Sequence, residues 1–295
     1  MNLAITGGRG FIGKWFLRIC GEKYRCTVFG RDKNTDSVKV GGKTHPYLST
    51  DYSYESLKEL LEDFDCVLHF AAERIGTSGR FTDFSDNVNI SSNIFAACRK
   101  LEIKNIIHLS SRMVYSCEKS MPWHEKLKVK PLNFYGISKH TVEQLSYIYN
   151  RLYSMNIKNL RTAQVFGPGE KDDFMFMKFV SLARKKNELK LFGSGKARRE
   201  YIYVKDVINA VENAIKNPGK RGIFNLGTGK NMSLEEIAKT INSVFDNSGN
   251  ITRISVKKED LSRSLMSIEK ISREFDWEPR WTLKSALEDM KNNME

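Results

Sequence analysis

The sequence predicts an α/β fold, a doubly wound parallel sheet with a smaller, interleaved α/β lobe that binds the substrate. Two observations carry this prediction. In the first half of the chain, short apolar segments alternate with helix-like segments, and strands that are apolar throughout are typical of a parallel sheet covered by helices on both faces. Beyond Gly169 the pattern loosens into helical stretches separated by glycine turns, which favours a second lobe at the carboxyl edge of the sheet.

The expected elements follow one another in a regular order. Strands are predicted at residues 3–5, 26–29, 66–70 and 106–109, and helices at 11–20, 55–61, 89–101, 174–186, 207–216 and 234–245. The chain has no repeat and no long linker. We therefore expect a first domain over residues 1–166 and a substrate-binding lobe over 167–295, with part of 201–226 returning to the first domain.

Composition narrows the class of protein and of partner. A chain of 295 residues with 40% hydrophobic residues can bury a full core. No apolar run approaches the roughly 20 residues of a membrane span, and the N-terminus lacks the pattern of a signal peptide, so a cytoplasmic protein without a membrane partner is expected. The formal charge of +13 favours anionic partners. No basic stripe is interleaved with aromatic residues, so nucleic acid is not expected. Five cysteines without a C-x-x-C pair indicate reduced thiols and no metal site.

A glycine-rich turn opens the chain. Gly7, Gly10 and Gly13 lie between the first strand and the first helix. The first permits a tight turn, the second lets the backbone approach a pyrophosphate, and the third allows the helix to pack closely. The N–H groups of the helix start, at Phe11 and Ile12, then face an anion. This context predicts a Rossmann-type dinucleotide site.

The end of the second strand bears on the choice of dinucleotide. A carboxylate there would bind the adenosine ribose and repel a 2′-phosphate, but Arg31 stands near that position and its planar fork suits a phosphate. This favours NADP. In the alternative, Arg31 is a solvated loop residue, Asp32 binds the ribose, and NAD is the cofactor. Asp51 could cap the following helix or accept a hydrogen bond from the adenine amino group.

A second motif supplies groups for proton transfer. Tyr135 and Lys139 are four residues apart, so both project from one face of a helix start. An ammonium beside a phenol stabilises its ionised form and so favours acid–base work near neutral pH. Ser111, at a strand end, offers a hydroxyl that can position a substrate oxygen. Together with the glycine turn, this motif predicts a nicotinamide-dependent oxidoreductase.

These motifs resemble the extended short-chain dehydrogenase/reductase family, in its nucleotide-sugar epimerase, dehydratase and reductase branch. The resemblance runs nearly end to end and includes Thr6 to Gly13, His69 to Ala72, Ser110 to Tyr115, Pro131 to Tyr135, Phe166 to Pro168, Arg199 to Asp206 and Trp277 to Pro279.

The resemblance implies a role for each matching residue. Tyr135 would be the acid/base, Lys139 would hold the nicotinamide ribose, Ser111 would bind the reacting oxygen, and Arg199 would grip the nucleotide diphosphate. In the alternative, Arg199 is an ion-pair partner at the surface. Tyr52, Phe70, Ala71 and Ala72 would border the cofactor, and Arg112 and Gln164 the substrate. The resemblance also implies a homodimer. The apolar residues Ile148, Tyr149 and Leu152 suit either a contact between two subunits or the core of one subunit.

Departures from the family pattern refine the reaction. Dehydratases of the family carry acidic residues directly after the catalytic hydroxyl, where this chain has Arg112 and Met113, so dehydration is not expected. Gln164 replaces the usual asparagine and alters the expected phosphate contact. The leading expectation is an NADP(H)-dependent enzyme that reduces a 4-keto nucleotide sugar, or performs the reverse oxidation. The alternative is a nucleotide-sugar 4-epimerase with tightly bound NAD. A non-catalytic relative would typically lack the tyrosine or the lysine, and both are present.

Overall fold

The computed structural model describes residues 1–73, 81–116, 118–172 and 174–293. Its centre is an eight-stranded sheet with the order β12-β7-β6-β5-β1-β2-β4-β3. Neighbouring strands are parallel except for the hairpin β3–β4 at one edge. The strands are β1 (Asn2–Thr6), β2 (Arg25–Gly30), β3 (Ser37–Val40), β4 (Lys43–Ser49), β5 (Cys66–His69), β6 (Asn105–Ser111), β7 (Asn156–Thr162) and β12 (Gly222–Leu226).

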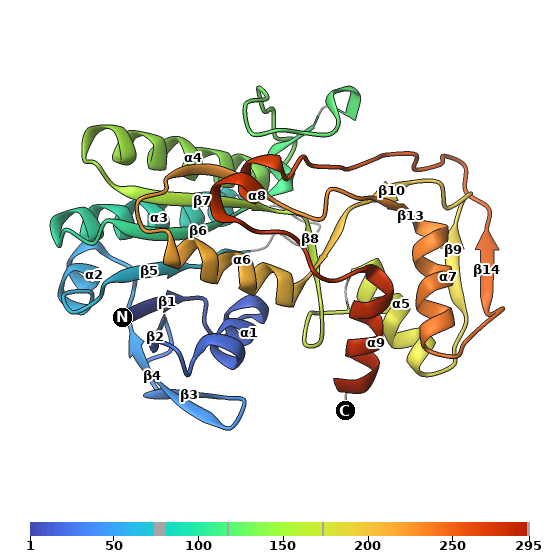
Figure 1. The fold of residues 1–295 in the computed structure, drawn as a ribbon, viewed down its shortest axis with the longest axis horizontal. Helices are drawn as coiled ribbons and strands as arrows, with labels where there is room; N and C mark the ends of the chain where they lie inside the picture. The colour runs from blue at the N-terminus through green and yellow to red at the C-terminus, as the bar shows by residue number, and fades with distance from the viewer. Residues whose placement is uncertain (74–80, 117, 173, 294–295) are drawn as a thin grey trace.

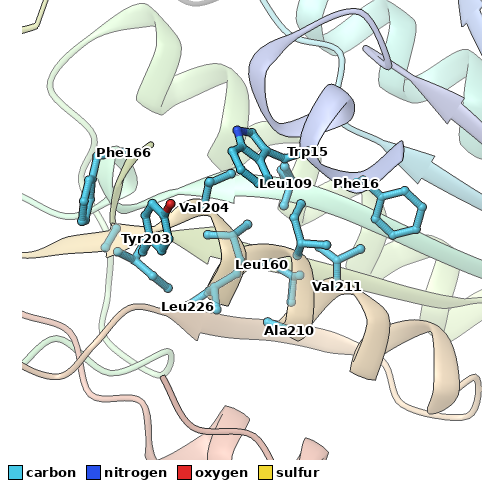
Figure 2. Close-up of a cluster of buried hydrophobic side chains, with 14 of the residues drawn as sticks. Trp15, Phe16, Leu109, Leu160, Phe166, Tyr203, Val204, Ala210, Val211 and Leu226 are labelled. Atoms are coloured by element: carbon cyan, nitrogen blue, oxygen red, sulfur yellow. The ribbon is translucent and has the colours of Figure 1, made fainter. Parts of the chain in front are cut away.

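Helices cover both faces of this sheet (Figure 1). One layer is α2 (Tyr54–Leu60), α3 (Phe81–Lys100) and α4 (Phe134–Leu152), and the other is α1 (Phe11–Cys20) and α6 (Val204–Lys216). Alternate residues of a strand therefore enter different cores. Leu3 and Ile5 belong to the cluster under α1 and α6, whereas Ala4 between them belongs to the cluster under α2, α3 and α4. Figure 2 shows part of the first cluster, which includes Phe16 of α1, Val211 of α6 and Leu160 of β7.

The smaller lobe lies beyond the carboxyl edge of the sheet (Figure 1). Three two-stranded ribbons, β8–β11, β9–β14 and β10–β13, connect its helices. Its elements are β8 (Gln164–Phe166), α5 (Met175–Arg184), β9 (Leu189–Phe192), β10 (Arg198–Arg199), β11 (Tyr201–Tyr203), β13 (Met232–Ser233), α7 (Leu234–Val244), β14 (Ile251–Ile254) and α9 (Leu283–Asn293). Helix α8 (Glu269–Phe275) instead packs against β12 and α6 of the larger domain. Two short 3-10 turns, η1 (Arg112–Val114) and η2 (Glu118–Ser120), follow β6.

The predicted fold class is confirmed, and the elements differ from it in detail. The sequence reading missed the β3–β4 hairpin, the strands β7 and β12 of the main sheet, the strands of the smaller lobe and the helices α8 and α9, and it began α3 eight residues late. Strand β12 belongs to the main sheet although it follows much of the smaller lobe in sequence; the boundary at residues 166 and 167 stays a prediction. No helix among the described residues is long and apolar enough to span a membrane. The thiols of Cys20, Cys26, Cys66 and Cys98 are free and buried, as expected, and Cys117 lies outside the described residues.

Candidate active site

The glycine turn has the shape that a bound diphosphate requires. Gly7 has a φ of +72°, and a Cβ at this position would lie 2.6 Å from the backbone nitrogen of Ala71. A Cβ on Gly13 would lie 2.3 Å from the carbonyl oxygen of Gly7. Gly10 is the N-cap of α1 and brings no capping side chain. The first N–H groups of α1 are therefore open to an anion, and these residues fit a dinucleotide.

A cavity of about 850 Å³ lies at the carboxyl ends of β6 and β7, next to this turn. Eight of the predicted site residues line it: Ile12, Phe70, Ala72, Ser111, Arg112, Tyr135, Lys139 and Gln164. The predicted catalytic residues are thus brought together with the border of the dinucleotide turn. The lining also includes Leu132, Phe134, Glu170 and Phe174, which the sequence reading did not assign to a site.

Local structure explains how Ser111 and Tyr135 come to the same cavity. Ser111 ends β6 and caps η1, where its Oγ accepts a hydrogen bond from the N–H of Met113 at 3.2 Å. Asn133 caps α4 by accepting from the N–H of Gly136 at 2.7 Å. A Cβ on Gly136 would lie 2.3 Å from the carbonyl oxygen of Met113. The absence of a side chain at Gly136 therefore lets η1 pack against the start of α4.

Lys139 is 3% exposed, and its ammonium has well-defined acceptors. Nζ donates to the carbonyl oxygen of Leu109 at 2.7 Å and lies 3.3 Å from Nε2 of His108. Burial holds the pKa of His108 well below its usual value, so its ring is neutral. Since Nδ1 of His108 faces Oδ1 of Asn159 at 2.9 Å, Nδ1 carries the proton and Nε2 accepts from Lys139.

Two of the three ammonium hydrogens of Lys139 are engaged by these acceptors, and Nζ lies 5.7 Å from the centre of the Tyr135 ring. Burial also lowers the pKa of Lys139 to about 7. The lysine is therefore poised between its two protonation states near neutral pH.

A buried ion pair lies one turn of α4 beyond Lys139. Glu143 accepts two hydrogen bonds from Arg161, at 2.9 and 2.7 Å, and one from the hydroxyl of Ser110 at 2.5 Å. Both charged side chains are at most 2% exposed. The sequence reading missed Glu143, although a signal was present: it continues the face of α4 that carries Tyr135 and Lys139, at the same spacing of four residues.

The end of β2 presents both cations and a carboxylate. The side chain of Arg31 is 53% exposed, and its nearest carboxylate among the described residues, Asp86, lies 3.9 Å away. Asp32 accepts from Arg9 at 2.6 Å and from the hydroxyl of Thr35 at 2.9 Å. The hydrogen bond from Arg9 lowers the pKa of Asp32 to about 2. Arg9, which belongs to the glycine turn, escaped the sequence reading.

Asp51 and Tyr52 lie close to this strand end and outside the cavity. Ser53, not Asp51, caps α2, which corrects the capping alternative; Asp51 instead accepts from the N–H of Ser53 at 2.8 Å. The residue directly before a helix is the one that can cap it, and the hydroxyl of Ser53 accepts from the N–H of Ser56, the third residue of α2. The phenol of Tyr52 donates to the carbonyl oxygen of Phe29, so its ring is packed in the core.

Arg199 lies apart from the cavity lining. Its guanidinium donates to Asp260 at 2.6 Å and to the carbonyl oxygen of Ser262 at 2.6 Å, and its side chain is 18% exposed. Arg199 therefore makes an ion pair, but its side chain is mostly buried and not at the surface, and its contact with a nucleotide diphosphate stays a prediction. The partner lies 61 residues further along the chain, so local sequence could not reveal it.

The chain matches a family model over residues 3–227, and that model describes the NAD dependent epimerase/dehydratase family. The chain belongs to this family. The match spans the glycine turn, the cavity and strand β12. It confirms the predicted resemblance and shows that the protein is an enzyme of the extended short-chain dehydrogenase/reductase type with a Rossmann fold.

Individual relatives are similar over the whole chain. The crystal structure of UDP-N-acetylglucosamine 4-epimerase from Bacillus cereus is 32% identical, covers 100% of this chain and 96% of that chain, and has a TM-score of 0.90. UDP-glucuronate 4-epimerase from Thermodesulfobacterium geofontis is 26% identical over 98% of this chain and 94% of its own length. UDP-glucose 4-epimerase from Thermotoga maritima has a TM-score of 0.88 at 24% identity, with 100% of each chain covered, and shares the fold.

Proposed function

We propose that the enzyme is a 4-epimerase of a UDP-linked sugar and that it retains NAD through the reaction. The observation that carries this proposal is the convergence of Ser111, Tyr135 and Lys139 on one cavity that adjoins the open N-terminus of α1. Relatives named as 4-epimerases match over the full chain, and an arginine stands where a dehydratase has an acid. The sequence reading ranked a reductase first. Because of these relatives, we now place the 4-epimerase before the reductase.

The residues of the cavity divide the chemistry among them. Gly7, Gly10 and the first turn of α1 would hold NAD, which when bound accepts a hydride from the sugar and returns it. Tyr135 takes the proton of the reacting hydroxyl and gives it back. The hydroxyl of Ser111 orients that oxygen. Lys139, fixed by Leu109 and His108, keeps a cation beside the phenol and favours its ionised form.

The second candidate is the NADPH-dependent reductase of a 4-keto nucleotide sugar. Arg31 favours it, because this exposed guanidinium has only a long, 3.9 Å pairing with Asp86 and can turn toward a 2′-phosphate. Asp32 favours NAD, because a carboxylate at the strand end binds ribose hydroxyls. The two candidates therefore differ in a property of the cofactor site that is measurable.

The two candidates differ in their cofactor, because an epimerase retains NAD whereas a reductase consumes NADPH. Protein purified without added cofactor is denatured, and the released dinucleotide is quantified by chromatography. The enzyme is then incubated with UDP-glucose or UDP-N-acetylglucosamine, and the C4 epimers are separated. An epimerase releases NAD on denaturation and converts the sugar with no added cofactor. Oxidation of added NADPH in proportion to product, weakened by Arg31→Ala, would instead establish the reductase.

The role of Tyr135 gives a direct test of the catalytic site. Tyr135→Phe is expected to lower kcat about 10²–10⁴-fold, because the general acid/base is lost, while the dinucleotide content stays that of the wild type. Tyr147→Phe, an exposed phenol on the same helix, is the matched control and should retain full activity. Equal activity of Tyr135→Phe and Tyr147→Phe would refute the assignment.

We also propose that the enzyme is a homodimer. The apolar side chains of Ile148 and Leu152 on α4 are 45% and 62% exposed, whereas Tyr149 packs edge-on against Phe95 and belongs to the core. Exposed apolar side chains that gather on one helix face favour a protein contact, and a second copy of the chain offers the same face.

A further inference from the structure

The cavity contains a cation that the proposed mechanism leaves unused. Arg112 directly follows Ser111, begins η1 and is half-buried in the cavity lining. Among the described residues, no carboxylate lies within 4.0 Å of its guanidinium and no hydrogen bond from its side chain is formed. Two other arginines with little exposed side chain behave differently: Arg161 is bound to Glu143, and Arg199 to Asp260.

Neighbouring charges do not compensate this guanidinium. Glu200 is the acidic residue whose charge acts on Arg112, but its carboxylate already accepts from the N–H groups of Thr228, Gly229 and Met266 at 2.7–2.9 Å. Burial, and after it the nearby positive charge of Arg199, lowers the pKa of Arg112.

A half-buried cation without an anion is costly unless a ligand supplies the anion. A guanidinium binds a carboxylate through two parallel hydrogen bonds. We propose that Arg112 binds a carboxylate on the sugar ring, so that the substrate is a nucleotide-linked hexuronic acid. This inference rests on the proposed function, because it uses the position of the reacting carbon.

The covalent structure of the sugar points to this group rather than to the diphosphate. Ser111 and Tyr135 would hold the oxygen on C4. The diphosphate is attached to C1, across the ring from C4, whereas the carboxylate of a hexuronic acid is attached to C5, the neighbour of C4. Arg112 is the neighbour of Ser111 in the chain, and both residues line the same cavity. Relatives act on both neutral and acidic sugars by their names, so Arg112 is the feature of this chain that selects between them.

The test compares two probes that differ at C6 alone. UDP-glucuronic acid and UDP-glucose are titrated calorimetrically into the full-length enzyme, together with UDP. We expect the wild type to bind UDP-glucuronic acid at least tenfold more tightly than UDP-glucose. Arg112→Gln should remove this difference and leave the affinity for UDP-glucose within about twofold. Arg112→Lys should restore part of the preference, because it restores the charge but not the fork. The matched control is Arg25→Gln, because Arg25 is exposed and lies at the start of β2, at the end of the sheet away from the cavity.

Two results would overturn the proposal. One is equal affinity of the wild type for the two sugars. The other is a loss in Arg112→Gln that is the same for both sugars and for UDP, since Arg112 would then contact the diphosphate. Retained dinucleotide and an unchanged unfolding midpoint verify that the variant is folded. Binding of dinucleotide without any binding of UDP or the two sugars would refute the proposed function itself, which distinguishes that failure from a failure of Arg112 alone.

Discussion

The ammonium of Lys139 sits in surroundings that do not favour a charge. Its two acceptors, the carbonyl oxygen of Leu109 and Nε2 of His108, are uncharged. Glu143, one turn further along α4, is engaged by Arg161. Burial therefore prevails and lowers the pKa of Lys139 to about 7. By the family resemblance Lys139 donates to the nicotinamide ribose, and an ammonium donates a stronger hydrogen bond than a neutral amine, so binding favours the protonated lysine.

This coupling predicts a pH dependence for the cofactor-free enzyme. Above about pH 7 free Lys139 is neutral, and binding must take up a proton, so the affinity for dinucleotide should fall by up to about tenfold per pH unit between pH 7 and 9. Below pH 7 the lysine is already charged and the affinity should level off. Fluorescence titration at fixed ionic strength measures both ranges.

Two variants identify the titrating group. Lys139→Met should bind dinucleotide more weakly and without this slope. Glu200, whose pKa burial raises to about 7, titrates in the same range, and Glu200→Gln should keep the slope of the wild type. An affinity of the wild type that is constant from pH 6 to 9 would contradict the prediction.

For single residues, the sequence could predict those site positions that follow from the spacing within one helix or from the end of one strand. Tyr135 and Lys139 share a helix face because they are four residues apart, and Ser111 ends a strand. The surroundings of Arg31 and Arg199 could not be predicted. Arg31 faces Asp86, and Arg199 pairs with Asp260; in each case the tertiary fold brings together residues that lie far apart in sequence.

Among the secondary-structure elements, helix α4 carries both residues of the candidate active site and a residue of a buried ion pair. Its inward face carries Tyr135 and Lys139 in the cavity and then Glu143 in the buried ion pair with Arg161 of β7. Ser110 of β6 donates to the same carboxylate. One carboxyl group thus joins a helix to two strands of the sheet, and the pairing lowers its pKa despite burial.

Removing this charge should unfold the enzyme at a lower denaturant concentration. Glu143→Gln is expected to lower the free energy of unfolding by about 3–5 kcal/mol, because it leaves the Arg161 guanidinium buried without its anion. Glu288→Gln removes an exposed partner of Lys284 and should cost at most about 1 kcal/mol. Chemical denaturation followed by circular dichroism measures both values. Equal midpoints for the two variants would show that the pair contributes no more than a surface contact.

The missed elements have physical explanations. Strands β3 and β4 form a hairpin at one side of the sheet, and their buried residues alternate with exposed ones, so they lack the apolar run that identifies a buried parallel strand. A signal was nonetheless present in Gly41-Gly42. Both residues have positive φ, of +59° and +81°, and two glycines between short strands are typical of a tight hairpin. Helix α9 carries few apolar residues, so its pattern is weak.

For the whole molecule, the outer face of α4 predicts how copies of the chain associate. Light scattering with size-exclusion chromatography should give twice the 33.9 kDa mass of the chain. The double variant Ile148→Asp/Leu152→Asp should shift the protein toward the monomer, because it places charges in an apolar contact. Leu261→Asp, which alters an exposed leucine in the smaller lobe, should leave the mass unchanged. A monomeric wild type would refute the dimer.

The position of strand β12 also has a consequence for how the enzyme is made. Residues 222–226 complete the edge of the central sheet by pairing with β7, which ends at Thr162. During synthesis, the sheet stays incomplete until residue 226 has left the ribosome. Until then β7 presents unpaired N–H and C=O groups, the kind of edge that recruits other chains. The edge of β7 therefore stays open to other chains for as long as the ribosome needs to add the 64 residues 163–226.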